Sequence, residues 1–186
     1  MDDRKLWTRF INGDDKAYSM LYERYVDILF PYGMGFTPNR ELVKDCIQDI
    51  FIRIFSRRKH LKKIDNVKLY LFIALKNALF NYFKRNELPR QTYHKEIEFN
   101  MAEPAFDVEF SIEDVIITSE KKEEYAERIN RMILGTLTSR QKEVIYYRYI
   151  EEMDLEMICE LMKMNYQSVL NLIPLRGYRH SIATRG

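Results

Sequence analysis

The sequence has few of the residues that build disulfide frameworks, metal sites or enzyme active sites. Its 186 residues include two cysteines and three histidines. Cys46 and Cys159 lie far apart, each on a helical apolar stripe, which predicts small core residues in a reducing compartment. The histidines have no metal-ligand spacing, and no Gly-rich phosphate loop, nucleophile elbow or HExxH pattern occurs. We therefore expect no metal, no cofactor and no enzymatic activity.

Glycine, proline and long apolar runs are also scarce. Only six glycines and five prolines occur, and long stretches without either favour helices over sheets and turns. A hydrophobic fraction of 46% is enough for a packed core. No segment resembles a signal peptide, and no stretch of 18 apolar residues is present. These features predict an all-α, cytoplasmic protein without membrane insertion.

Charge is distributed unevenly, although the net charge is only +2. Residues 1–86 carry 17 basic and 10 acidic residues, a balance of +7. Residues 87–136 carry 6 basic and 12 acidic residues, a balance of −6, and residues 137–186 have a balance of +1. The basic block predicts a polyanionic partner. Charge alone leaves open that it is a solvated face without a partner.

We expect a first helix that is capped by Asp14 or Asp15 and ends near Pro31 and Gly33. Two further helices follow it in the basic block. In "ELVKDCIQDIFIRIFSRR" the predicted core face is an unbroken helical stripe of Val43, Cys46, Ile47, Ile50, Phe51, Ile54 and Phe55. Another face carries Asp45, Gln48, Asp49 and Ile52. Such a face is either solvated surface or a contact point.

The second helix, "VKLYLFIALKNALFNYFKR", follows a basic connector that contains Arg57, Arg58, Lys59, Lys62 and Lys63. We expect its core face to consist of Leu71, Leu75, Ala78, Leu79 and Tyr82. Cations, amides and rings are interleaved elsewhere on it, at Lys68, Lys76, Asn77, Phe80, Lys84 and Arg85. This mixture is typical of single-strand binding, in which rings stack on bases and cations follow the backbone. Helical aromatic residues are, however, more often core.

Periodicity fades from Glu87 to Ser119, which predicts an acidic linker, and then resumes. Thr138 and Gln141 form a capping-box pair, and Asp154 and Asn165 can each cap a following helix. A short helix, a tight turn and a helix with a polar N-terminal face make a helix-turn-helix candidate. Plain helix packing is the alternative.

Taken in order, these segments resemble a bacterial RNA polymerase sigma factor of the extracytoplasmic-function (ECF) group of the sigma-70 family. "DDKAYSMLYERY" is similar to the family's opening helix, and Asp45, Gln48, Asp49 and Phe51 match its most diagnostic pattern. Asn77 and Asn81 match polar positions of the following segment, and "LTSRQ" matches the entry to the C-terminal domain. The resemblance covers roughly residues 8–86 and 125–173.

The resemblance implies a promoter-specificity subunit with two small helical domains. Residues 1–86 would bind core RNA polymerase and the −10 element, residues 87–119 would be the acidic linker, and residues 120–186 would read the −35 element by helix-turn-helix. Promoter DNA and core RNA polymerase are the implied partners, with an anti-sigma factor as a further one. The implied polymerase-binding residues are Asp45, Gln48, Asp49 and Ile52. The implied −10 residues are Arg57, Arg58, Lys59, Lys62, Lys63, Lys76, Asn77, Phe80 and Lys84. The implied −35 residues are Tyr166, Gln167, Ser168 and Asn171.

Two other functions compete with this interpretation. One is a helical interaction or regulatory protein that keeps the sigma fold with weakened promoter binding. The other is a one-domain DNA-binding repressor, which leaves the two clearest helices unexplained.

The sequence departs from the ECF pattern after Ile173. Leu170 stands where the family commonly has Lys or Arg, and Pro174 interrupts the recognition helix, because proline disfavours helix at the residue before it. We expect a helix that ends near Ile173, followed by a tail with Arg176, Arg179 and Arg185. Either the protein reads its −35 element weakly, or its C-terminus has been altered, for instance by a frameshift. The abruptness of the departure favours the second explanation.

Overall fold

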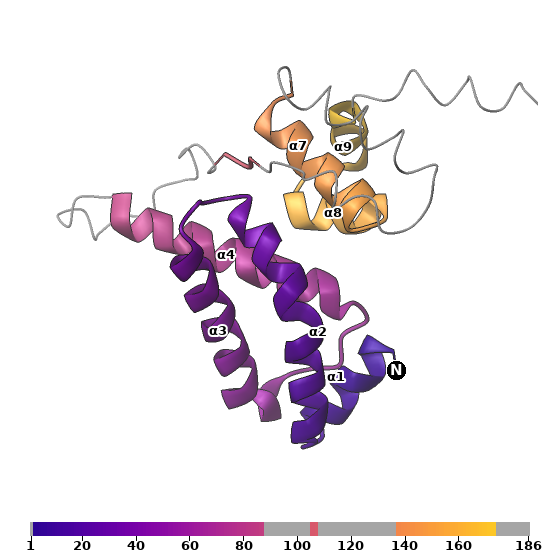
Figure 1. Ribbon diagram of the computed structural model, residues 1–186. Helices are drawn as coiled ribbons and strands as arrows, with labels where there is room; N and C mark the ends of the chain where they lie inside the picture. Colours follow the sequence, from indigo (N-terminus) through magenta and orange to yellow (C-terminus); the bar gives the residue numbers. More distant parts are fainter. Residues whose placement is uncertain (1, 88–104, 108–136, 174–186) are drawn as a thin grey trace, which may run out of the picture. The chain divides into compact units, whose positions relative to one another are not determined.

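The computed structural model describes residues 2–87, 105–107 and 137–173 (Figure 1). The described residues form helices and coil without a strand, which confirms the predicted all-α fold. The chain divides into two compact units, Met1–Pro104 and Ala105–Gly186. None of the described helices combines the length and the apolar character that crossing a bilayer requires.

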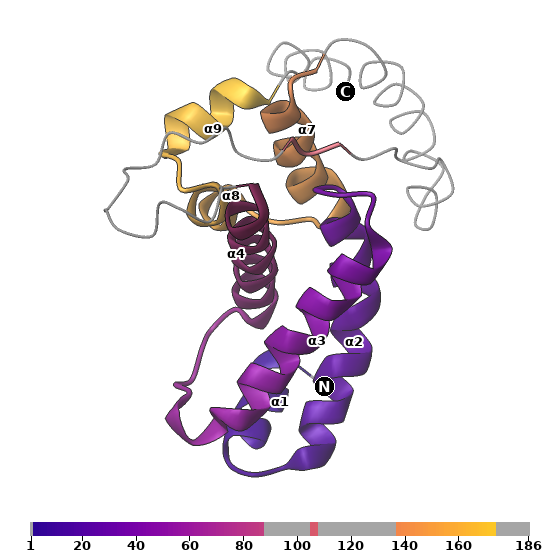
Figure 2. The same cartoon turned by 90° about the vertical axis from the view of Figure 1, so that its left-hand side faces the viewer.

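The first unit is a helical bundle. Its elements are α1 (Asp3–Ile11), α2 (Asp15–Met34), α3 (Arg40–Ser56), a 3-10 turn η1 (Arg58–His60) and α4 (Val67–Glu87). Helix α2 packs against α1, α3 and α4, and α3 packs against α4. Figures 1 and 2 show α2 and α3 side by side along most of their lengths. Helix α1 is an addition to the helices that the sequence predicted.

Side-chain caps determine where three of these helices begin. The Asp14 carboxylate accepts hydrogen bonds from the backbone N–H groups of Lys16 and Ala17, so Asp14 is the cap of α2. Asn39 caps α3 and Asn66 caps α4 in the same way. Each cap satisfies backbone donors that the first turn of a helix leaves unpaired.

The core of this unit follows the predicted stripe of α3 closely. All of its seven predicted core residues are buried except Phe55, which is 42% exposed. Gly33 allows α2 to approach α3, since a Cβ at this position would lie 2.5 Å from Val43 Cγ1. The predicted core face of α4 needs a correction: Leu71, Leu75 and Leu79 are buried, but Ala78 is half-buried and Tyr82 is 43% exposed.

The second unit contains α7 (Ser139–Ile145), a π-helical turn η2 (Tyr146–Ile150), α8 (Leu155–Met162) and α9 (Tyr166–Leu172). The predicted capping box of Thr138 and Gln141 is present at the start of α7. The predicted caps Asp154 and Asn165 accept hydrogen bonds from Met157 N–H and Ser168 N–H, both at 2.8 Å.

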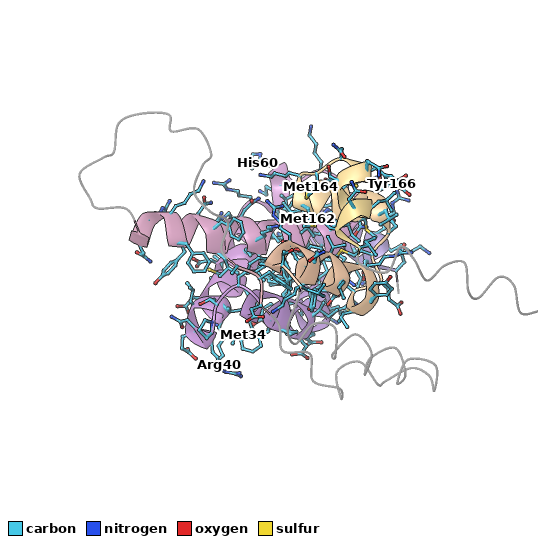
Figure 3. The ribbon with its side chains drawn as sticks, turned by 90° about the horizontal axis from the view of Figure 1, so that it is seen from above. Met34, Arg40, His60, Met162, Met164 and Tyr166 are labelled. Atoms are coloured by element: carbon cyan, nitrogen blue, oxygen red, sulfur yellow. The ribbon has the colours of Figure 1, made fainter. Side chains whose placement is uncertain are left out.

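Helices α8 and α9 form a tightly turned pair that packs together. Lys163 ends α8 in the left-handed region at φ 53°, and Asn165 begins α9 two residues later. Figure 3 shows Met162, Met164 and Tyr166 around this turn. Helix α9 ends at Leu172 and Ile173 is extended, as the sequence predicted. The tail from residue 174 lies outside the described residues.

A short described segment, residues 105–107, belongs to the second unit. Phe106 is 1% exposed, and its ring lies 5.5 Å from the ring of Tyr146. The Phe106 backbone both donates to and accepts from the Ser139 hydroxyl, and Lys142 Nζ lies 2.5 Å from an Asp107 carboxylate oxygen. This part of the predicted linker 87–119 therefore packs on α7. The remaining residues of that linker, apart from Glu87 at the end of α4, lie outside the described residues.

Candidate nucleic-acid and polymerase interfaces

The predicted polymerase-binding residues share one outward face of α3. Asp45, Gln48, Asp49 and Ile52 are all exposed, and Ile52 is 63% exposed. The opposite face of the helix is buried, so the backbone that carries them is held rigidly. Burial raises the pKa of the Cys46 thiol, and the neighbouring Asp49 and Asp45 carboxylates raise it further. The face is thus locally negative around one exposed apolar side chain.

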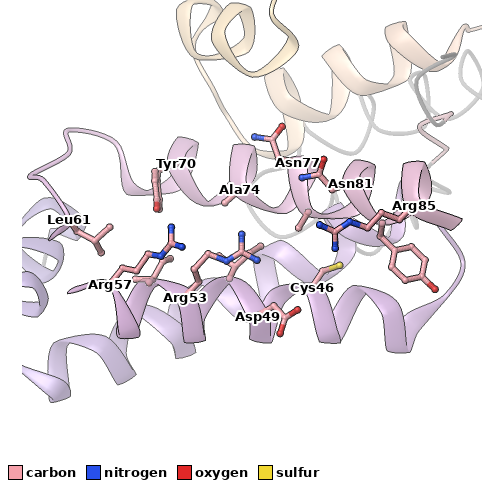
Figure 4. Close-up of a pocket in the computed structure, with 14 residues that line it drawn as sticks. Cys46, Asp49, Arg53, Arg57, Leu61, Tyr70, Ala74, Asn77, Asn81 and Arg85 are labelled. Carbon is pink, nitrogen blue, oxygen red and sulfur yellow. The ribbon is translucent and has the colours of Figure 1, made fainter. Parts of the chain in front are cut away.

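A groove of about 460 Å³ lies between α3 and α4 (Figure 4). Arg53 of α3 and Arg57, which directly follows α3, extend into it, and Arg85 extends into it from the last turns of α4. Asn77 and Asn81 line it one turn apart along α4. The other lining residues are Cys46, Asp49, Ile50, Ile54, Leu61, Tyr70, Ala74, Ala78 and Tyr82.

The groove combines positive charge with hydrogen-bonding and aromatic groups. Its lining includes three arginines and a single carboxylate, that of Asp49. Within the described part of the chain, Arg53, Arg57 and Arg85 enter no ion pair. Guanidinium groups present several donors in a plane that matches phosphate oxygens, and an asparagine amide both donates and accepts. The arrangement can therefore hold a phosphate backbone and contact the edge of a base.

Two of the predicted −10 residues on α4, Lys76 and Phe80, pack against other side chains and do not line this groove. Lys76 is only 7% exposed, and its Nζ lies 5.8 Å from the ring centroid of Phe36 and 5.5 Å from that of Phe80. Phe80 is half-buried and packs edge-on against Phe36 at 5.5 Å. Both residues lie on the stripe of α4 that begins with buried Phe72, and in this structure both pack against the Phe36 ring. Asn77, one position further along the helix, faces the groove instead.

The basic connector only partly joins the groove. Arg57 lines it, whereas Arg58 pairs with Asp15 at 2.6 Å and lies over the Phe55 ring at 5.4 Å. Lys59, Lys62 and Lys63 are exposed, and Lys84 is half-buried on α4.

Sequence reasoning missed three groove residues as candidate contacts. Arg53 was not among the predicted contacts, and Tyr70 and Tyr82 were not recognised as groove-lining aromatic residues. Arg85 was predicted as part of the cation and ring mixture of this helix but was not assigned to the −10 element. A usable signal existed in the four-residue spacing of Asn77, Asn81 and Arg85, which places them on one side of a helix.

The predicted −35 residues lie together at the start of α9. Tyr166 is 53% exposed, and Gln167 and Asn171 are exposed on one face, where Gln167 Nε2 donates to Asn171 Oδ1 at 3.0 Å. Ser168 is half-buried and its backbone N–H is used by the Asn165 cap. Val169 is the buried residue that anchors α9.

Comparisons with known proteins found one matching family model and solved structures of similar fold. Residues 21–88 match the family model described as Sigma-70 region 2. A solved structure of CnrH in complex with the cytosolic domain of CnrY is similar in fold, with a TM-score of 0.53 and 17% sequence identity, covering 92% of this chain and 89% of that chain. No curated protein sequence matches the chain. Residues 21–88 therefore match a Sigma-70 region 2 domain, and this match supports the predicted resemblance to the ECF group of the sigma-70 family.

Proposed function

We propose that this protein is a sigma-70 family promoter-specificity subunit that binds core RNA polymerase and directs initiation at promoters with particular −10 and −35 elements. The observation that carries the proposal is the α3–α4 groove. All of its lining residues lie within the segment 21–88 that matches Sigma-70 region 2. Its arginines, amides and aromatic rings are the groups that a single DNA strand requires.

In this proposal the groove receives the melted −10 strand. Arg53, Arg57 and Arg85 contact phosphates, while Asn77 and Asn81 contact base edges. Tyr82 offers an exposed ring to an unstacked base. These roles replace those first assigned to Lys76 and Phe80, whose side chains pack against Phe36. The exposed connector residues Lys59, Lys62 and Lys63 add positive charge beside the groove, and we retain Lys84 as a weaker phosphate contact.

The polymerase-binding face is Asp45, Gln48, Asp49 and Ile52. Charged side chains on a rigid helix select a partner of complementary charge and fix the register of docking, while an exposed apolar residue supplies buried contact area. Asp49 also lines the groove, so the two proposed interfaces adjoin on α3.

We assign −35 recognition to Tyr166, Gln167, Ser168 and Asn171 of α9. The helix has only seven residues, so it offers about two turns to a major groove. One buried residue anchors it, and we expect the −35 contribution to be weak. This short helix is also the observation that favours the second candidate function, a regulatory protein that keeps the sigma fold with weakened promoter binding.

Protein partners belong to the proposal as well. The structure similar in fold holds CnrH in complex with the cytosolic domain of CnrY. We propose that this chain also binds a protein partner, an anti-sigma factor, which covers the first unit and competes with core polymerase.

The test uses the full chain with purified core RNA polymerase. Fluorescence anisotropy measures complex formation, and run-off transcription from a randomised promoter library measures which −10 and −35 sequences are selected. We expect binding and selection of a defined −10 motif. Polymerase binding without any selected motif would favour the regulatory alternative, and no binding to core polymerase would reject both sigma-type functions.

A further inference from the structure

Helix α1 precedes the segment that matches Sigma-70 region 2, yet it contacts the connector at one end of the groove. We propose that Trp7 of α1 is a positioning residue for the groove, because it fixes the α3–α4 connector. The inference rests on the proposed function, since it assigns the groove to single-stranded DNA.

The main contact joins residues that are far apart in the sequence. Trp7 Nε1 donates a hydrogen bond to the Lys62 carbonyl oxygen at 3.0 Å, and the Trp7 side chain is buried, with 2% exposure. Lys62 lies in coil between η1 and α4, where no helical ladder supplies a donor for its carbonyl. The indole N–H therefore satisfies a backbone group that would otherwise need water.

The same indole also contacts the groove wall. The Trp7 ring lies edge-on to the Tyr70 ring, with centroids 5.4 Å apart, and Tyr70 lines the groove beside Leu61 and Arg57 (Figure 4). Arg4 pairs with Asp65 of the connector, but both side chains are mostly exposed, so this pair contributes little. Trp7 thus connects α1 to both the connector and the first turn of α4.

Fixing the connector before DNA arrives lowers the ordering entropy that binding would otherwise have to offset. The backbone of Lys62 is held directly, and Leu61 and Lys63 are held through their peptide bonds to it. Without the indole donor, the basic side chains beside the groove would sample more conformations, and affinity for a single strand would fall.

The chain contains one tryptophan, which makes the test specific. Growth on benzothienylalanine replaces the indole N–H by sulfur at this single position and keeps the two fused rings. The variant Trp7→Phe removes the donor by mutation, and Leu6→Val is the matched control, because Leu6 is a fully buried residue of α1 whose aliphatic side chain cannot donate to the connector carbonyl. Thermal unfolding checks that each protein is folded.

Two quantities are measured on the full-length proteins: hydrogen exchange of connector amides, and affinity for a single-stranded oligonucleotide bearing the −10 motif selected by the unsubstituted chain. Loss of the bond should speed connector exchange and weaken oligonucleotide binding, each about two- to tenfold relative to Leu6→Val. Unchanged exchange in the benzothienylalanine protein would overturn the inference. So would faster exchange with an affinity equal to that of the control. If the unsubstituted chain binds no oligonucleotide, the proposed function fails and the inference fails with it.

Discussion

The Nζ of Lys76 lies 5.5 Å from the centre of the Phe80 ring, one helical turn away, and neither residue lines the groove between α3 and α4. The cation is buried against two rings rather than presented to phosphate. The neighbouring Asn77 and the later Arg85 line the groove instead. Two consecutive residues of this helix therefore differ in position: Lys76 packs in the core, and Asn77 lines the groove.

The first prediction concerns the salt dependence of single-strand binding. Arg53→Ala and Arg85→Ala should each reduce the slope of log K against log salt by about 0.7, because each removes one phosphate contact. Lys76→Met should leave the slope unchanged, since the Lys76 ammonium is buried. Binding measured by fluorescence anisotropy between low and moderate salt decides the matter. A lower slope for Lys76→Met with unchanged slopes for both arginine variants would contradict the assignment.

Asn77 should determine base preference rather than general affinity. Asn77→Ala is expected to lose about 1–3 kcal/mol on the preferred −10 sequence and much less on others, because an amide that contacts a base edge is removed. Selection from a randomised −10 library measures this directly. Asn86→Ala is the matched control, being an exposed asparagine of the same helix outside the groove. Identical selected motifs for the unsubstituted chain and Asn77→Ala would exclude base contact by this residue.

A charge reversal tests the polymerase-binding face. Asp49→Lys places the wrong sign in a complementary surface and should weaken binding to core polymerase, by several kcal/mol at most. Glu41→Lys is the control, because Glu41 is an exposed acid of the same helix that lies outside the proposed face. The two variants are compared by titration of labelled protein with core polymerase. Equal affinities would remove Asp49 from the interface.

Phe106 should stabilise the second unit, although it precedes the described helices of that unit by about thirty residues. Phe106→Ala removes a fully buried ring that packs on Tyr146 and is expected to reduce the stability of this unit by about 3 kcal/mol. Hydrogen exchange of residues 139–173 in the full chain measures the loss. Asp107→Asn, which affects only an exposed ion pair, should have little effect. Protection unchanged by Phe106→Ala would show that the ring is dispensable.

Asp14 should contribute to stability in a pH-dependent way. The side-chain hydrogen bond from Arg9 lowers its pKa most, followed by the backbone N–H of Ala17. A carboxylate with a lowered folded-state pKa stabilises the fold above its unfolded pKa of about 3.9, and this contribution is lost as the pH falls through the folded-state pKa. Asp14→Asn keeps an N-cap acceptor without the charge. We expect urea unfolding at neutral pH to give a higher free energy of unfolding for the unsubstituted chain than for Asp14→Asn. This difference should disappear as the pH is lowered to 2. A difference that stays constant over this range would refute the assignment.

Local sequence signals predicted much of this protein. Apolar residues recur every three or four positions in α3, and this spacing identified both its buried stripe and its acidic face. The caps Asp14, Asp154 and Asn165 were predictable, since a short polar side chain can satisfy the open donors of a first turn whatever surrounds it. The early end of α9 follows from Pro174 acting on Ile173, which is likewise a local effect.

Tertiary structure decided the features that depend on neighbours remote in the sequence. Helix α4 is apolar or aromatic on most of its sides, so its periodicity could not say which face α2 covers and which face remains open beside α3. The positions of Lys76 and Tyr82 follow from that choice. Trp7 reaches Lys62 across 55 residues, and Phe106 reaches Ser139 across 33, and nothing in either local segment specifies the partner. Helix boundaries and caps are properties of a few adjacent residues, whereas the groove exists only because packing brings two helices together with their arginines and amides on the same side.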